Sequence, residues 1–186
     1  MKEHPIIFSS EMVRVILDGR KTMTRRIVKK HPLIEAGFTI DFINDPGNAG
    51  LCPYGQPGDR LWVRENIHRG KEGNLAFYAA DKGLVTKNGE CVPWIFNEPH
   101  VSSIHMPRWA SRITLEITDI RIERLQDISE DDAEAEGAHG YTNAASPIDF
   151  FICLWNSLNT KRNFSWDMNP WVWVISFKRI EEGRKL

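Results

Sequence analysis

A lysine, a threonine and an arginine follow a glycine at fixed spacing in the segment Gly19-x-Lys21-x-x-Thr24-x-Arg26. Neighbouring cations and partial burial would lower the pKa of the lysine amine, so that it could accept a proton. A threonine hydroxyl beside such a base can act as a nucleophile, and the planar fork of Arg26 can hold a carbonyl, a carboxylate or a phosphate. On spacing alone, the motif equally fits a solvated basic turn, which is the commoner structure.

A second candidate is Glu136, the last carboxylate of the acidic segment 131–136. Ser129 and Asp132 have the spacing of a capping box that opens a short helix, and Gly137 is placed to end it. Glu136 is therefore expected at the negative end of a helix dipole, a position that suits acid or base chemistry. A solvated acid on an acidic helix is the alternative that the local sequence favours.

The element that must position Lys21 is a helix over residues 10–17, capped by Ser9 and ended by Gly19. A strand is expected to follow at residues 27–28. Lys21 lies in the turn between them, and we expect its side chain to be exposed. A change of Lys21 should then alter stability by no more than about 0.5 kcal/mol.

Alternation of apolar and polar residues predicts several strands. The clearest covers residues 112–125, where the phase flips near Thr118, as in a strand that bends around a small barrel. The last strand, at residues 171–177, is apolar on both faces. A type II turn at 56–59 leads into a strand at 61–65. A helix opened by Ser146 and Pro147 should bury one face, made of Phe151, Leu154, Trp155 and Leu158.

Strands and helices that do not alternate regularly favour an α+β fold built on a small β-barrel. The 186 residues are enough for a single domain, residues 1–186. Two stretches, about 31–56 and 66–110, are predicted to be insertions. The first is rich in Gly, Pro and Asn; the second contains an apolar strand candidate at 75–80 and is otherwise irregular. The longest apolar run is six residues, too short to cross a membrane. Three cysteines without a CxxC pair favour a reduced, cytoplasmic protein.

Charge is unevenly distributed although the net charge is only −1. The first 30 residues contain eight Lys and Arg against three Asp and Glu, whereas residues 116–136 contain nine acids and two arginines. The basic segment predicts weak, salt-sensitive binding to RNA. Two solvated faces of opposite sign are the simpler interpretation of charge alone.

Other residue groups carry weaker signals. The segment Pro107-Arg108-Trp109 offers a cation and an aromatic ring that could stack on a base, or a tryptophan packed under a loop. The spacings of Cys91, His100 and His105 fit no zinc pattern, and no phosphate-binding glycine loop is present. The sequence predicts neither a metal nor a cofactor.

Four segments together resemble the ASCH domain, a relative of the PUA RNA-binding fold: GRKTMTRR at 19–26, PGDRLWVRE at 57–65, ITLEITDIRIERLQDIS at 113–129 and WVWVISF at 171–177. The resemblance covers nearly the whole chain, and the layout is similar to ASCH proteins of phages and prophages. The broad family has glutamate at the position of Thr24. Threonine there is similar to small bacterial ASCH amidohydrolases that remove the acetyl group from N4-acetylcytidine.

The resemblance implies a site and a mechanism. Those enzymes use a lysine, a threonine three residues later and a distant glutamate, which match Lys21, Thr24 and Glu136. Thr24 would attack the acyl carbonyl, Lys21 would take its proton, and Glu136 would position or activate the hydrolytic water. Arg26 would support the oxyanion or the base. The residues expected to contact a nucleoside or RNA substrate are Arg26, Trp62, Arg64 and Trp109.

Three other functions stay open at this point. The same cleft could bind RNA or a modified nucleobase without turnover. It could cleave RNA, with Lys21 and Glu136 as the acid and base pair. The insertions could instead carry a role in phage assembly or in contact with the host. The sequence does not separate the non-catalytic binding module from the hydrolase, because a protein that binds a modified base and one that hydrolyses it need similar pockets.

Overall fold

The computed structural model describes residues 1–29, 32–43, 45, 52–71, 74–138 and 146–180. The elements are β1 (Glu3–Ile7), α1 (Ser10–Leu17), β2 (Met23–Ile27), α2 (Pro32–Glu35), α3 (Ile40–Ile43), β3 (Arg60–Arg64), β4 (Ile67–Arg69), β5 (Ala76–Tyr78), β6 (Thr86–Lys87), β7 (Glu90–Cys91), β8 (His100–Val101), β9 (Thr114–Arg124), α4 (Glu130–Ala135), α5 (Pro147–Asn159) and β10 (Trp171–Ile180). The predicted α+β class is confirmed. No helix in these ranges is long and apolar enough to cross a membrane.

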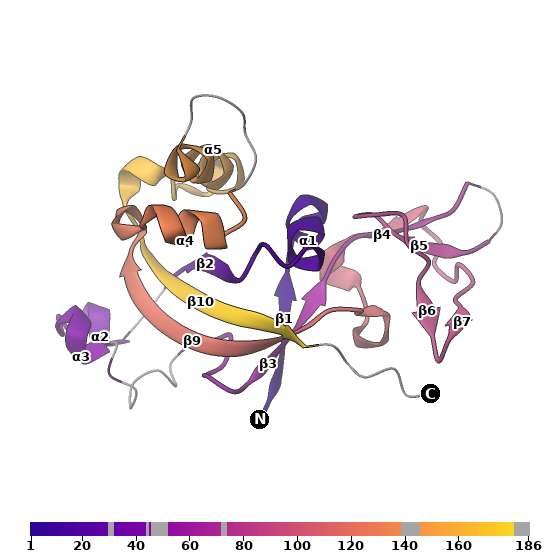
Figure 1. The fold of residues 1–186 in the computed structure, drawn as a ribbon, viewed down its shortest axis with the longest axis horizontal. Coiled ribbons are helices and arrows are strands. Elements are labelled where there is room, and N and C mark those ends of the chain that lie inside the picture. The colour runs from indigo at the N-terminus through magenta and orange to yellow at the C-terminus, as the bar shows by residue number, and fades with distance from the viewer. Residues whose placement is uncertain (30–31, 44, 46–51, 72–73, 139–145, 181–186) are drawn as a thin grey trace.

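A curved five-stranded sheet forms the centre of the molecule, with strand order β1-β3-β9-β10-β2 (Figure 1). β1 and β3 are parallel, and the other pairs are antiparallel. Between β9 and β10, Asp119 lies opposite Ser176 but Ile117 lies opposite Phe177, so Thr118 has no partner. This bulge confirms the predicted change of phase, because one extra residue turns the following side chains to the other face.

The sheet curls, as expected for a small barrel, but it does not close. β1 and β2 are its two edges, and no backbone pairing joins them among the described residues. A side chain does bridge the opening: Arg26 Nη2 donates to the carbonyl oxygen of Ile7, at the end of β1, at 2.7 Å. The open side of the barrel is where the candidate site lies.

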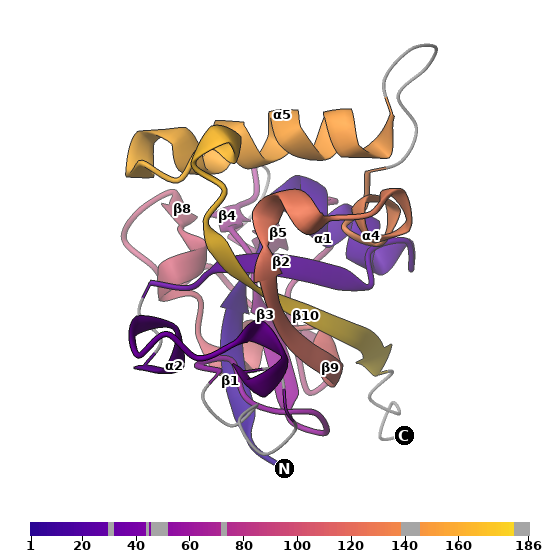
Figure 2. The same cartoon turned by 90° about the vertical axis from the view of Figure 1, so that its left-hand side faces the viewer.

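Apolar side chains cover both faces of β10, as its sequence predicts. Trp173 and Ile175 pack into a core shared with α1, β1, β3 and β9. Val172 and Val174 point the other way, into a core shared with α4 and α5. Figure 2 shows α5 lying across this second face, above β2 and β10. The sheet is therefore a buried middle layer between α1 on one side and the α4–α5 pair on the other.

Three serine caps fix where the helices begin, as expected from the sequence. The Oγ atoms of Ser9, Ser129 and Ser146 accept hydrogen bonds from backbone amides three residues later, at 3.2–3.3 Å. The predicted buried face of α5 is only partly right. Phe151 and Trp155 are buried, whereas Leu158 is 56% exposed, because the last turn of the helix lies beside an open cavity.

Residues 66–110 are more regular than predicted. They form a three-stranded sheet, β5-β4-β8, and the hairpin β6–β7 around a small core of their own. Arg112, which precedes β9, fastens this part to the central sheet: its guanidinium donates to Asp81 at 2.7 and 3.0 Å and to the buried carboxylate of Glu65, after β3, at 2.9 and 3.0 Å. In the other predicted insertion, 31–56, the structure has the short helices α2 and α3. Residues 46–51 lie outside the described ranges.

Candidate functional site

Lys21 and Glu136 meet although 115 residues separate them in sequence. The amide of Thr22 donates to the carbonyl oxygen of Ala135 at 2.9 Å and so ties the start of β2 to the end of α4. Gly137 has φ +95, and a Cβ there would lie 2.9 Å from Val15 on α1. A residue without a side chain is therefore needed where α4 ends against α1.

The lysine and the glutamate form a buried ion pair. Lys21 Nζ donates to Glu136 Oε2 at 2.6 Å and to the Glu136 carbonyl oxygen at 2.7 Å. Only 3% of Lys21 and 5% of Glu136 is exposed. The exposed lysine expected from the sequence is thus wrong: the chain turns back after α1, and the C-terminal end of α4 covers the side chain.

Burial lowers the pKa of the Lys21 amine below its ordinary value of 10.5, because water no longer solvates the ammonium. The carboxylate of Glu136 acts against this shift, and the cations of Arg26 and Arg25 add to it. A lysine in this setting loses its proton more readily than a solvated one, as a general base must.

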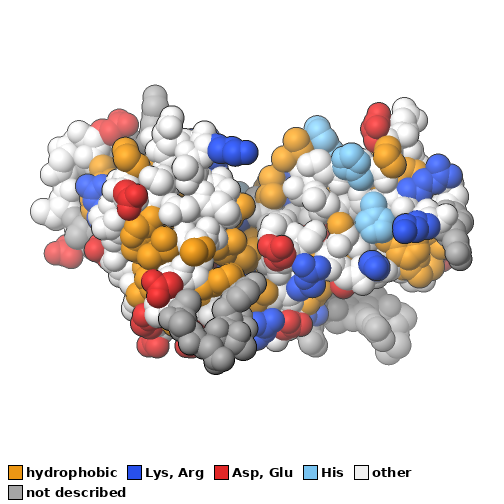
Figure 3. Space-filling model, turned by 90° about the horizontal axis from the view of Figure 1, so that it is seen from above, with side chains coloured by type: hydrophobic (Ala, Val, Ile, Leu, Met, Phe, Trp, Pro, Cys, Tyr) orange, Lys and Arg blue, Asp and Glu red, His pale blue; other side chains and the backbone are white. Residues whose placement is uncertain are grey.

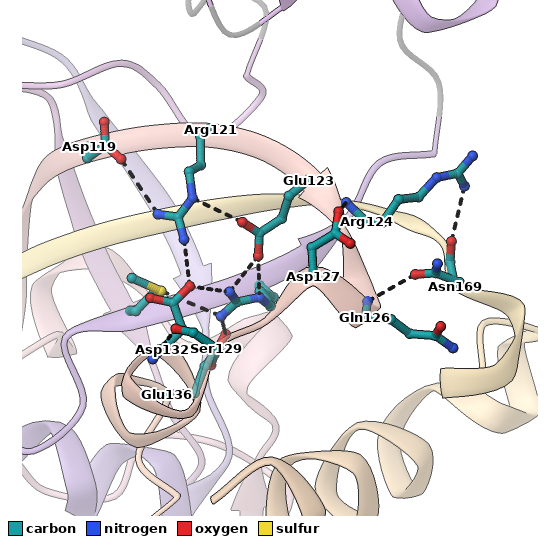
Figure 4. Close-up of polar contacts among 12 residues, drawn as sticks. Asp119, Arg121, Glu123, Arg124, Gln126, Asp127, Ser129, Asp132, Glu136 and Asn169 are labelled. Atoms are coloured by element: carbon teal, nitrogen blue, oxygen red, sulfur yellow. Dashed lines mark hydrogen bonds and ion pairs between the residues drawn. The ribbon is translucent and has the colours of Figure 1, made fainter. Parts of the chain in front are cut away.

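Arg25 holds the carboxylates of α4 in place. Its guanidinium is fully buried and donates to Glu123 on β9 and to Asp132 on α4, with Nη2 2.5 and 2.6 Å from the two carboxylates. Arg25 Nη1 also lies 3.6 Å from Glu136 Oε1. Arg121 reaches Glu123 and Asp132 from the solvent side, as Figure 4 shows. This network fixes the end of α4 to β2 and β9.

One oxygen of Glu136 remains available. Oε2 accepts the hydrogen bond from Lys21, but Oε1 is buried and accepts no hydrogen bond from the described residues. An unsatisfied buried carboxylate oxygen is costly unless a ligand or a water occupies the space beside it. Glu136 Oε1 therefore keeps unused acceptor capacity beside the Arg25 guanidinium, 3.6 Å away.

A cavity of about 480 Å³ opens beside this pair, on the open side of the sheet. Lys21, Thr24, Arg26 and Glu136 all line it. The edge strand β2 forms one wall, the start of α1 another, and α5 a third. Thr24 is buried on β2, and its hydroxyl makes no hydrogen bond to a described residue. Four of the residues that the resemblance implies are thus brought together.

The other three expected contact residues lie elsewhere. Trp62 and Arg64 are on β3, and Trp109 is in a short helical turn of the 66–110 segment. None of the three lines the cavity. Arg64 has an indirect link to it, because its guanidinium donates to the Ile104 carbonyl oxygen, next to Ser103 in the cavity wall.

Sequence reasoning missed most of the wall. The remaining lining residues are Ile7, Phe8, Ser9, Met12, Arg25, Ile27, Lys29, Tyr54, Asn66, Ser103, Phe151, Leu154, Trp155, Leu158, Asn159 and Arg162. One signal was available for α5. Its four residues with helical spacing, which were expected on a buried face, all line this cavity. Asn66, Ser103 and Arg162 stand in no motif, so no local signal could have placed them there.

The surroundings of the cavity combine an apolar and a polar side. Seen from above, hydrophobic side chains gather over α4 and α5, and a notch separates them from the 66–110 segment, where histidines are exposed (Figure 3). Among the described residues no three His, Cys, Asp or Glu side chains form a group that could hold a metal ion. The chemistry that this site offers is that of a lysine, a carboxylate and a hydroxyl.

Comparison with solved structures finds likenesses of the fold, among them the following two. No family model and no curated protein matches the chain. An ASCH domain from Lactobacillus crispatus JV V101 aligns with a TM-score of 0.46 and 13% identity, over 96% of this chain and 79% of that one. A DUF984 protein from Enterococcus faecalis V583 aligns with a TM-score of 0.45 and 12% identity, over 97% and 81%. The first bears the name of the family that the sequence resembles.

Proposed function

We propose that this chain hydrolyses the exocyclic amide of an N4-acylated cytidine, as a nucleoside or within RNA. The observation that carries the proposal is the buried Lys21–Glu136 pair facing a cavity with an unengaged threonine hydroxyl. The cavity volume, about 480 Å³, lies in the range of small-molecule sites. Apolar and aromatic side chains of α1 and α5 offer surfaces for a planar base.

In the first half of the reaction, Thr24 Oγ forms a bond to the acyl carbon while its proton passes to the neutral amine of Lys21. The bond between that carbon and N4 then breaks. N4 leaves as the amine of cytidine, with the proton returned by the Lys21 ammonium. The product of this half is an acyl ester on Thr24.

In the second half, a water attacks the ester. Glu136 Oε1, which accepts no hydrogen bond from the described residues, accepts one from this water and helps to remove its proton. The ester bond breaks, Thr24 Oγ recovers a proton, and the acyl group leaves as a carboxylic acid. The net reaction consumes one water and needs no cofactor.

A specific contact favours a second candidate, a non-catalytic binding module. Lys21 Nζ donates to two oxygens of Glu136, and both contacts stabilise the ammonium form. A lysine held in that form would anchor a ligand without accepting a proton. The two candidates make different demands on residue 21, so one substitution separates them.

The test is incubation with N4-acetylcytidine and with short RNAs, followed by chromatography of the products. Lys21→Arg keeps the charge but cannot supply a neutral base, and Thr24→Val removes the hydroxyl at constant shape. We expect hydrolysis of N4-acetylcytidine by the native chain, and no turnover with either variant. Thr22→Val is the matched control, because Thr22 is exposed and outside the cavity wall.

Each outcome selects a function. Full hydrolytic activity of Lys21→Arg would contradict the mechanism. Binding without any product, retained in Lys21→Arg, would favour the binding module. Shortened RNA with intact N4-acetylcytidine would instead indicate a ribonuclease.

A further inference from the structure

The cavity wall contains more positive charge than its own acids neutralise. Five cations line it, Lys21, Arg25, Arg26, Lys29 and Arg162, against the single carboxylate of Glu136. Glu136 pairs with Lys21, and Arg25 is neutralised from behind the wall by two further carboxylates. Arg26, Lys29 and Arg162 therefore remain as the charges that face the cavity.

These three cations have few partners. Arg26 donates through Nη2 to the Ile7 carbonyl oxygen, while its Nε is buried without a hydrogen-bond partner. Arg162 donates through Nη1 to Asn159 Oδ1, a long contact of 3.4 Å. Among the described residues none of the three forms an ion pair with a carboxylate. Apart from these two hydrogen bonds, the donors of the three side chains have no hydrogen-bond partner among the described residues.

The cations also act on one another. Burial lowers the pKa of the Arg26 guanidinium. Tyr54 and Glu136 oppose this shift, and the positive charge of Arg162 adds to it. Like charges that surround a partly dry cavity raise the free energy of the empty site. An anion between them would remove that repulsion.

The charged side chains of the cavity wall differ in burial. Lys21 and Glu136 are buried at its inner end, Arg26 is half-buried, and Lys29 and Arg162 are exposed. A ligand that reaches Thr24 with its reactive group would therefore carry its negative charge toward the mouth. Two arginine forks and a lysine suit the several oxygens of a phosphate better than a single carboxylate.

We propose that Arg26, Lys29 and Arg162 form a phosphate-binding subsite at the mouth of the cavity, so that the ligand is a nucleoside carrying a phosphate. The orientation of the base rests on the proposed function, but the subsite itself rests on the three unpaired cations. The phosphate is either the monoester of a free nucleotide or a diester of an RNA strand.

The test measures binding of cytidine, cytidine 5′-monophosphate and the trinucleotide CpCpC by titration calorimetry. Arg162→Gln is compared with Lys161→Gln, which removes the same charge from the exposed neighbour outside the wall. We expect the monophosphate to bind the native chain about tenfold more tightly than cytidine, in keeping with a charge-assisted hydrogen bond. Arg162→Gln should remove most of that preference, and Lys161→Gln should keep it.

A parallel assay compares hydrolysis of N4-acetylcytidine with that of its 5′-monophosphate. If the nucleoside and the nucleotide bind equally, or if Arg162→Gln and Lys161→Gln behave alike, the subsite is wrong even where hydrolysis is observed. If neither compound is hydrolysed but the phosphate preference depends on Arg162, the subsite stands and the proposed function fails. Tighter binding of CpCpC than of the monophosphate would identify RNA as the source of the phosphate.

Discussion

At the scale of single residues, the Lys21–Glu136 pair serves both the fold and the site. Taking two charges out of water has a large cost, which the pair recovers only while both members are present. The pair joins the start of β2 to the end of α4 and also supplies the base and the carboxylate of the proposed reaction. Stability and activity are therefore coupled at these two positions.

Lys21→Met is expected to lower the free energy of unfolding by about 3 kcal/mol, because it leaves a buried carboxylate without its partner. The double change Lys21→Met with Glu136→Leu should recover much of this loss, since it removes both charges. Urea denaturation measures all three chains, with Lys161→Met as an exposed control. A loss under about 0.5 kcal/mol for the single change would contradict the buried pair.

The lowered pKa of Lys21 has a consequence for the pH dependence of turnover. Only the neutral amine can accept the proton of Thr24, and its fraction rises as pH rises toward the pKa of Lys21, which lies below 10.5. We expect kcat for N4-acetylcytidine to increase with pH and to level off above that pKa.

The lowered pKa of Lys21 also sets how the stability of the protein changes with pH. The folded chain binds this proton more weakly than the unfolded chain, so the contribution of Lys21 to stability is present above the unfolded pKa and declines as pH falls through the folded pKa. A pH profile of kcat together with melting at each pH separates the two effects. A kcat that falls with rising pH while the protein stays folded would exclude Lys21 as the base.

At the scale of elements, Arg25 connects three of them. Its fully buried guanidinium joins β2 to Glu123 on β9, to Asp132 in the first turn of α4 and to Glu136 at the C-terminal cap of α4. Arg121 touches two of the same carboxylates, but 32% of its side chain is exposed. Water can replace the contacts of Arg121 and cannot replace those of Arg25.

Arg25→Lys should therefore reduce the free energy of unfolding by about 3 kcal/mol, because lysine cannot reproduce the fork between buried acids. It should also lower kcat, because Glu136 loses its fixed position beside Lys21. Arg121→Lys should cost at most about 1 kcal/mol and leave kcat unchanged. Chemical denaturation and steady-state kinetics on both variants provide the comparison. Equal losses of stability and of kcat in the two variants would contradict the role of Arg25 in joining β2, β9 and α4.

The elements whose signals are local could be predicted from the sequence. The serine caps, the helix at 10–17 and the bulge at Thr118 depend on residues within a few positions of one another. The strands within 66–110 are two or three residues long. The apolar run at 75–80 does mark β5. The other short strands depend on partners brought together by the fold, so alternation along the chain could not reveal them.

The candidate site shows the same division. Spacing identified Lys21, Thr24 and Arg26 as a group, since they share one turn and one strand. The link to Glu136 came from a family resemblance, because nothing local relates two residues so far apart. Arg162, which stands in no motif, reaches the cavity only because α5 crosses the face of β2 and β10.

At the scale of the whole molecule, folding changes the meaning of the basic N-terminal segment. Its excess of positive charge in the sequence predicted a basic face. In the structure Arg20 pairs with Asp18, Lys21 with Glu136, and Arg25 with Glu123. Arg26 and Lys29 remain for an anionic ligand at the cavity mouth and are joined there by Arg162, from the helical turn that follows α5.

This difference predicts the salt dependence of RNA binding. For single strands, log K falls with log salt by about 0.7 for each phosphate neutralised, so three cations at the mouth give a slope of about −2. A free N-terminal face with a net charge of +5 would give about −3.5. Titration of a fluorescent oligocytidylate between about 50 and 200 mM salt distinguishes the two slopes. Arg162→Gln should make the slope shallower by about 0.7, while Lys161→Gln should leave it unchanged. A steep slope that is insensitive to Arg162 would place the RNA on another face of the molecule.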